Sequence, residues 1–339
     1  MDILKEIKGK LSKVSDEDRP KGINAVLAHI EISEKYYVKG IAEKDEHYFT
    51  DVIYRTNHAF EGILKEAYEV IQEQNASNKS PYEIEQFLAD NDLLNARVMQ
   101  LFINYRQNWR NPSTHDYQLF FGSQEAFLAI VTVSSFVNVL LDQIVEKLAY
   151  KSAKLKSIEH VTAYKSGIKG YSKLSLMNKV SQILRGYCNY FQENFAQLIE
   201  LPEPELLGGL KGYISAFEPN WKISTNQIIA GTKSKINPDM VIDNNKDKFI
   251  VQFKRSGTEN TSLFYGDISA EYEQLSNFLS NSEIKQGVVL HTPHKKGDAI
   301  ITGHVNSDTL REVYSIEDSM LPNEENEENE ENYQLTKPD

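Results

Sequence analysis

Helical spacing of apolar residues dominates the first part of the chain. In the segments 23–43 and 49–74, apolar residues recur every three or four positions. That period places them along one side of a helix, so each segment predicts an amphipathic α-helix. A third pattern with the same period extends to residue 109, from a start at residue 81 or 93.

The helical pattern stops at a proline and resumes beyond it. Pro112 disfavours helical geometry at Asn111, so the third helix is expected to end there. Ser123 is then expected to cap a fourth helix that runs to about Tyr150. Glu125 falls in its first turn, where the helix dipole favours an acid.

The fourth helix contains an uncharged stretch, residues 126–141. A membrane span needs about 20 apolar residues. This stretch is shorter, and serine, threonine and asparagine residues interrupt it. We therefore expect no membrane contact and a helix buried at the centre of a bundle. Residues 1–150 are predicted to form a helical bundle of four or more elements.

The pattern changes in the second half of the chain. Residues 151–172 are basic and polar, and together with a helix up to residue 200 they predict a linker and connecting helix. From about residue 205 short strands are expected. Apolar residues at 240–242 and 249–253 flank an asparagine-rich turn, which is typical of a hairpin. A helix at 271–284 and strands at 286–292 and 299–305 complete a prediction of mixed α and β structure for residues 201–318.

Composition and charge limit the classes of protein. The chain has 339 residues and a net charge of −12, and six glutamates between residues 323 and 332 supply half of that charge. Residues 319–339 are expected to form a disordered acidic tail. The remaining charge of about −6 does not indicate a protein that coats nucleic acid non-specifically. A single cysteine, Cys188, and no visible secretory signal are typical of the cytoplasm.

One candidate site lies between the third and fourth helices. Arg110, Asn111 and His115 stand within six residues there. They are compatible with an ordinary polar turn. They also suit metal-free RNA cleavage, in which histidine transfers a proton and arginine stabilises the phosphorane charge. One such set is sparse, and two sets facing each other across a two-fold axis would make a fuller cleft.

The spacing R-N-x-x-x-H within a helical bundle resembles the HEPN superfamily, over roughly residues 20–150. The resemblance implies a homodimer, or a higher even-numbered oligomer, formed through the helices that carry the motif. It also implies a metal-independent endoribonuclease of a prokaryotic anti-phage or toxin system. Arg110, Asn111 and His115 would be its catalytic residues, and RNA its substrate.

A second candidate site lies on the predicted hairpin. Asp239 precedes one strand, and Gln252 and Lys254 leave the same face of its partner. Asp239 and Gln252 would hold Mg²⁺, and Lys254 would act on the attacking water. An ordinary hairpin with solvent-facing polar side chains is the alternative.

These residues resemble the PD-(D/E)xK restriction-endonuclease-like superfamily, with glutamine in place of the acid as in its Mrr-like branch. The resemblance implies a mixed sheet with flanking helices that cleaves or senses DNA. A further acidic ligand would be expected from a preceding helix, and Glu205, Glu218 and Asp243 are the candidates. Because glutamine is neutral, the metal site would have one negative charge fewer. A nuclease-like fold that binds nucleic acid without cleaving it is therefore a further alternative.

The sequence therefore predicts a multidomain α and α/β protein with three functional alternatives. The first is an endoribonuclease acting through Arg110 and His115. The second is a Mg²⁺-dependent DNase in which the bundle only dimerises. The third is a non-enzymatic nucleic-acid sensor or antitoxin-like binding protein. His291 and His294 could bind metal or phosphate, but two histidines of a surface loop give the same pattern.

Overall fold

The computed structural model describes residues 2–12, 14, 20–91, 93–94, 96–116, 118–225, 228–231, 235–255, 265–292, 302–306 and 309–314. The chain divides into two compact units. The N-terminal unit comprises Met1–Lys151 with Pro204–Gly208, and the C-terminal unit comprises Ser152–Glu203 with Gly209–Asp339. The acidic tail expected at 319–339, together with Tyr117 and His294, lies outside the described residues.

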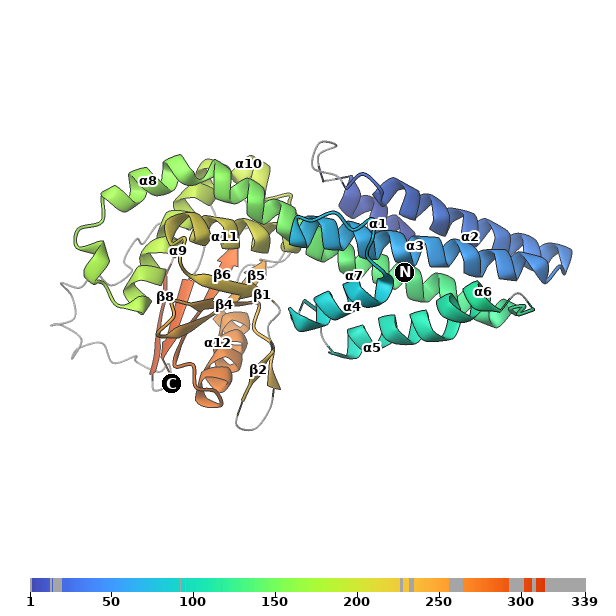
Figure 1. The fold of residues 1–339 in the computed structure, drawn as a ribbon. Coiled ribbons are helices and arrows are strands. Elements are labelled where there is room, and N and C mark those ends of the chain that lie inside the picture. Colours follow the sequence, from blue (N-terminus) through green and yellow to red (C-terminus); the bar gives the residue numbers. More distant parts are fainter. Residues whose placement is uncertain are drawn as a thin grey trace. The chain divides into compact units, whose positions relative to one another are not determined.

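The N-terminal unit is a bundle of helices (Figure 1). Its elements are α1 (Ile3–Leu11), α2 (Ile23–Glu43), α3 (His47–Gln72), α4 (Pro81–Asp90), α5 (Ala96–Tyr105), the π-helix η1 (Arg106–Arg110), α6 (Asn111–His115) and α7 (Ser123–Lys156). Their apolar faces share one core, in which Phe60, Phe102 and Phe136 are almost fully buried and pack ring against ring. The bundle predicted for residues 1–150 is therefore present.

Two parts of the bundle differ from the sequence prediction. The third helical pattern is two helices, because α4 ends at Asp90 and α5 begins at Ala96. Ser80 and Glu83 cap α4 reciprocally, so the earlier of the two proposed starts is a true helix start. The short helix α1 was not predicted, and it buries Ile7 and Leu11 in the core.

Pro112 does not end the helical path. The path continues from α5 through η1 into α6 without a break. In η1 the Asn111 N–H donates to the carbonyl of Arg106, five residues back. Pro112 then falls in the first turn of α6, a position that tolerates proline. The rule that proline ends a helix predicted a stop here. The wider π-turn instead accommodates Pro112 within the helical path.

Helix α7 carries the uncharged stretch. It is long and apolar enough to cross a membrane, and 56% of its most apolar 18-residue window is buried inside the protein. Val133, Val137, Leu140, Leu141 and Ile144 are among its core residues. A central bundle helix has these properties, as the sequence predicted. Glu125 in the first turn accepts a hydrogen bond from the Gly122 N–H.

The C-terminal unit opens with helices where an irregular linker was expected. Instead of ending near Tyr150, α7 continues to Lys156, and α8 (Ile158–Ser166) follows. The linker prediction for 151–172 was wrong because few apolar residues suffice to anchor a short helix, and Val161 is the buried one in α8. A 3₁₀ turn η2 (Tyr171–Lys173), α9 (Leu176–Glu193), α10 (Phe195–Leu198) and α11 (Glu203–Phe217) complete the helical part. Cys188 is buried in α9, as expected for a core residue.

Strands begin later than the sequence predicted, because α11 occupies residues 203–217. The strands are β1 (Lys222–Thr225), β2 (Ile229–Ala230), β3 (Lys235–Ile236), β4 (Met240–Asp243), β5 (Lys248–Arg255), β6 (Gln286–Thr292), β7 (Thr302–Asn306) and β8 (Thr309–Tyr314). A mixed sheet has the order β1-β4-β5-β6, extended by β7 and β8, and β2 and β3 pair separately. Strand β5 is parallel to β6 and antiparallel to β4.

The predicted hairpin and its helix are present. Strands β4 and β5 pair with Met240 opposite Val251, and Asn245 takes a positive φ of 72° in the turn. Helix α12 (Tyr265–Ser280) covers one face of the sheet with Leu275 and Leu279. The sheet residues beneath it are Val241, Ile250 and Val289. Because side chains alternate, Gln252 and Lys254 belong to this same face.

Candidate functional site

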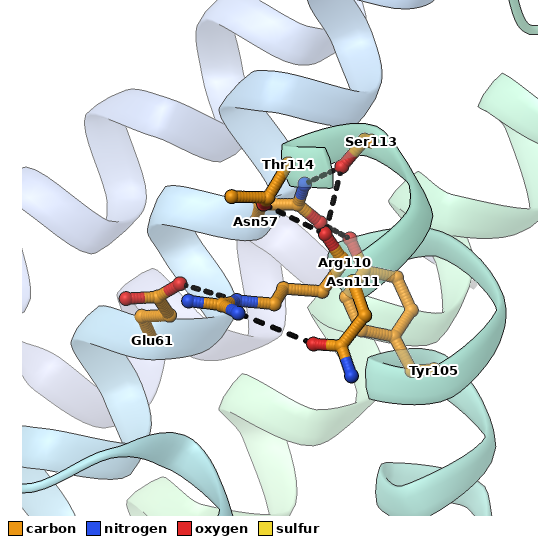
Figure 2. Close-up of polar contacts among 7 residues, drawn as sticks. All are labelled: Asn57, Glu61, Tyr105, Arg110, Asn111, Ser113 and Thr114. Atoms are coloured by element: carbon orange, nitrogen blue, oxygen red, sulfur yellow. Dashed lines mark hydrogen bonds and ion pairs between the residues drawn. The ribbon is translucent and has the colours of Figure 1, made fainter. Parts of the chain in front are cut away.

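The first candidate site is built on the π-turn. Arg110 ends η1, and Asn111 begins α6. The Arg110 Nε donates to Glu61 Oε1 of α3 over 2.8 Å, and its Nη1 donates to Asn111 Oδ1 over 3.2 Å (Figure 2). A guanidinium has more N–H donors than these contacts use. The side chain is therefore held in place and keeps donors for a further anion.

A hydrogen-bond network that is partly buried supports the turn (Figure 2). Asn57 of α3 donates from Nδ2 to Ser113 Oγ over 2.6 Å, and its Oδ1 lies 2.9 Å from Tyr105 Oη. Ser113 and Thr114 hydroxyls both donate to the carbonyl oxygen of Arg110. Burial raises the pKa of Tyr105 above its usual range, so the phenol stays a neutral donor. The network ties the backbone of Arg110 to the core.

Loss of Asn57 should loosen this turn. In Asn57→Ala the Ser113 hydroxyl loses its buried donor and the Tyr105 hydroxyl loses one neighbour. We expect the free energy of unfolding to fall by about 1–3 kcal/mol, the cost of buried groups left unpaired. Chemical denaturation would measure it. Thr114→Ala is the control, because Thr114 is exposed and bonds the same carbonyl. Equal, small losses in both variants would contradict a structural role for the network.

His115 lies at the last position of α6 with an exposed side chain. Within the described part of the chain, no hydrogen bond or ion pair joins it to Arg110. Five residues along a helix turn the two side chains roughly 140° apart. Asn111 precedes His115 by four residues and so shares its side of the helix, while also binding Arg110. Asn111 thus contacts Arg110 and lies on the side of His115, but the arginine and the histidine do not meet within one copy.

A buried ion pair anchors the other end of η1. Arg106 Nε donates to Glu85 Oε2 of α4 over 2.8 Å, and the side chain of Glu85 is 1% exposed. Glu85 Oε1 is buried and has no hydrogen-bond partner among the described residues. Burial raises the pKa of Glu85, while the hydrogen bond from Arg106 acts in the opposite direction. Both ends of the π-turn are therefore fastened to other helices of the bundle.

The second candidate site brings Asp239 and Gln252 together, as the sequence predicted for the hairpin. The Asp239 N–H donates to Gln252 Oε1 over 3.2 Å, and Asp239 Oδ2 accepts from the Phe253 N–H over 2.8 Å. Gln252 is buried, and Lys254 is half-buried on the same face of β5. Each of the two side chains thus accepts a hydrogen bond from the backbone of the other strand segment, next to the start of β4.

The residues present fit a Mg²⁺ ion poorly. Mg²⁺ takes oxygen ligands, usually with one or two carboxylates. The described part of this site supplies one carboxylate, and Asp239 Oδ2 and Gln252 Oε1 already accept backbone hydrogen bonds. No group of three or more histidine, cysteine or acidic residues that could hold a metal occurs among the described residues. This donor set suits a structural cross-link between strands better than a metal centre.

The candidates for a further acidic ligand lie elsewhere. Asp243 is at the far end of β4, about 13 Å along the strand from Asp239. Glu218 follows α11 and is paired with Lys165 of α8 over 3.2 Å. Glu205 lies in the first turns of α11. His291 of β6 lies opposite Lys254 of β5 in the backbone register.

Sequence reasoning missed the residues that support Arg110. Asn57 and Glu61 lie one turn apart on α3, inside a segment recognised only for its apolar stripe. The available signal was polar residues at core positions: Thr56 and Asn57 interrupt the stripe between Ile53 and Phe60. Buried polar residues need partners, so such an interruption indicates a contact with another polar segment.

The chain matches no protein-family model, no curated protein and no solved structure.

Proposed function

We propose that this protein is a metal-independent endoribonuclease of the HEPN type. The observation that carries the proposal is the fixed Arg110 guanidinium, held by Glu61 and Asn111 one short helix before the exposed His115. A π-turn inside a helix often marks a functional site, and here it presents this motif. The bundle and the order of its residues agree with the resemblance drawn from the sequence.

The reaction requires two proton transfers, one from the 2′-hydroxyl of the RNA and one to the leaving 5′-oxygen. The 2′-oxygen of the RNA attacks the adjacent phosphorus, and the bond from phosphorus to the 5′-oxygen breaks. His115 takes the proton from the 2′-hydroxyl or gives one to the leaving 5′-oxygen, and water or the His115 of the second copy makes the other of these two transfers. Arginine stabilises the charge that develops on the phosphorane. The products are a 2′,3′-cyclic phosphate and a 5′-hydroxyl.

A second copy of the chain would complete the site. One copy offers a single Arg110, with a glutamate already beside it, and a histidine that does not reach it. Directly after the motif, the apolar surface formed by Phe120, Phe127, Leu128 and Val131 is exposed by 59%, 51%, 50% and 39%. Phe127, Leu128 and Val131 lie within about one turn of α7, and exposed apolar side chains so close together favour association. A two-fold axis there would face two motifs toward each other.

An RNA cleavage assay with EDTA tests the proposal. We expect cleavage of single-stranded RNA to persist in EDTA and to leave 2′,3′-cyclic phosphate ends, because no step uses a metal. Mass spectrometry of the products would identify the ends. Cleavage that EDTA abolishes, with 3′-hydroxyl products, would contradict the mechanism. No cleavage, with RNA binding retained, would favour a sensor or antitoxin-like binding protein.

The C-terminal unit supports a second candidate function. From α11 onward, apart from the separate β2–β3 pair, the chain follows the order α11, β1, β4, β5, α12, β6, with β5 and β6 parallel, which supports the PD-(D/E)xK resemblance. The poor fit to Mg²⁺ favours nucleic-acid binding over cleavage. A Mg²⁺-dependent DNase activity that Lys254→Ala abolishes would instead make this unit the enzyme.

A further inference from the structure

Two histidines and an arginine form a cluster on the outer side of α2 and α3. The rings of His29 and His58 are stacked, with centroids 5.0 Å apart and planes 18° from parallel. Arg55 Nη1 lies 3.5 Å from His29 Nδ1. His58 is exposed, and His29 and Arg55 are half-buried, so the cluster opens to solvent.

Arg55 gives the cluster a fixed positive charge. Within the described part of the chain, no carboxylate forms an ion pair with any of the three residues. Burial lowers the pKa of His29, and the neighbouring His58 and Arg55 lower it further by charge repulsion. The guanidinium of Arg55 is the fixed positive charge of the cluster, and it attracts an anion that approaches from the solvent.

The cluster lies beside the motif. His58 precedes Glu61 by three residues on α3, so the two side chains are neighbours on the helix surface. Glu61 holds Arg110. His29, Arg55, His58, Glu61 and Arg110 thus follow one another across the surface from α2 to η1.

We propose that His29, Arg55 and His58 form an anion-binding subsite for a phosphate of the RNA strand next to the one that is cleaved. The identity of the strand rests on the proposed function, whereas the capacity to bind a phosphate group rests on the cluster itself. Arg55 supplies a fixed charge with a planar set of donors, and the two imidazoles supply N–H donors. The subsite positions the strand and takes no part in proton transfer.

Binding of a 2′-O-methyl oligoribonucleotide, which cannot be cleaved, tests the subsite. Fluorescence anisotropy with the full-length chain would give the affinity at several salt concentrations. Arg55→Gln should weaken binding about tenfold and reduce the dependence of log K on log salt by about 1, as expected for one lost phosphate contact. His58→Gln should weaken it less. Lys35→Gln on α2 removes the same charge from an exposed position and should change binding less than about twofold.

The outcomes separate the two proposals. Equal affinities for Arg55→Gln and Lys35→Gln would overturn the subsite even if RNA is cleaved. Weaker binding by Arg55→Gln would support the subsite even if no RNA is cleaved and the endoribonuclease proposal fails. A second arm adds inorganic phosphate and follows the ring protons of His29 and His58 by NMR. Shifts with phosphate, but no oligonucleotide binding, would overturn the assignment to RNA. Should Arg55→Gln fold poorly, His58→Gln at its exposed position replaces it, and an affinity equal to that of Lys35→Gln would overturn the subsite.

Discussion

Replacing His115 by alanine is expected to slow RNA cleavage about 10²–10⁴-fold, which is the usual contribution of a general acid or base. His115 is exposed at the end of α6 and is not among the described residues of the bundle core, so thermal unfolding should be almost unchanged. A fold that persists while activity is lost would separate chemistry from stability. Single-turnover cleavage of a labelled RNA at saturating enzyme would measure the effect.

Two control variants sharpen this test. Gln107→Ala changes an exposed polar residue of the same π-turn and should leave cleavage unchanged. Lys254→Ala changes the second candidate site and should also leave RNA cleavage unchanged. Cleavage by His115→Ala at the wild-type rate would remove His115 from the mechanism.

Mixing two inactive variants tests whether two copies share the site. Arg110→Ala chains keep His115, and His115→Ala chains keep Arg110. A mixed dimer would retain one arginine and one histidine in a common cleft, so mixing should restore part of the activity. A mixture that stays as inactive as its components would argue that each copy carries a complete and separate site.

Replacing Arg106 by methionine is expected to lower the free energy of unfolding by about 3–5 kcal/mol at neutral pH. The Glu85 carboxylate is 1% exposed, and Arg106 makes the ion pair that compensates its charge. A buried carboxylate that loses its partner remains uncompensated. Urea unfolding followed by circular dichroism would measure the loss. The π-turn starts at Arg106, so RNA cleavage should fall as well.

The destabilisation should depend on pH in a defined direction. Burial already raises the pKa of Glu85 above its ordinary value of 4.5, and loss of Arg106 raises the pKa further. Below 4.5 the carboxyl is protonated in both folded and unfolded chains, so the variant loses little. As pH rises from there through the raised pKa of the folded state, the folded chain holds a proton that the unfolded chain releases, and the loss grows.

A double variant provides the matched control. Glu85→Leu with Arg106→Met replaces the pair by apolar side chains, and such replacements of buried ion pairs are often neutral or stabilising. We expect most of the lost stability to return and its pH dependence to disappear. A double variant as unstable as Arg106→Met alone would show that packing by Arg106, which also lies over the Tyr82 ring, matters more than its charge.

Local sequence patterns were sufficient to predict the helices and the hairpin that depend mainly on neighbouring residues. The bounds of α2 agree with the apolar period at 23–43, and the β4–β5 hairpin agrees with two alternations around a turn at Asn245. Period and turn chemistry need only neighbouring residues. The same rules were wrong at Pro112 and in 151–172. A π-turn relieved the proline, and Val161 was enough to anchor α8 in an otherwise polar segment.

The sequence by itself determined the helical bundle, the hairpin and the identity of Arg110, Asn111 and His115 as a polar group between two helices. Only the tertiary structure decided what holds that group. Asn57, Glu61 and Glu85 are distant in sequence, and long-range pairing of buried polar atoms leaves no local period. The tertiary structure likewise engaged Asp239 and Gln252 with backbone groups and gathered His29, Arg55 and His58 beside Arg110. Hydrogen bonds and charge, unlike apolar burial, depend on which groups meet across the fold.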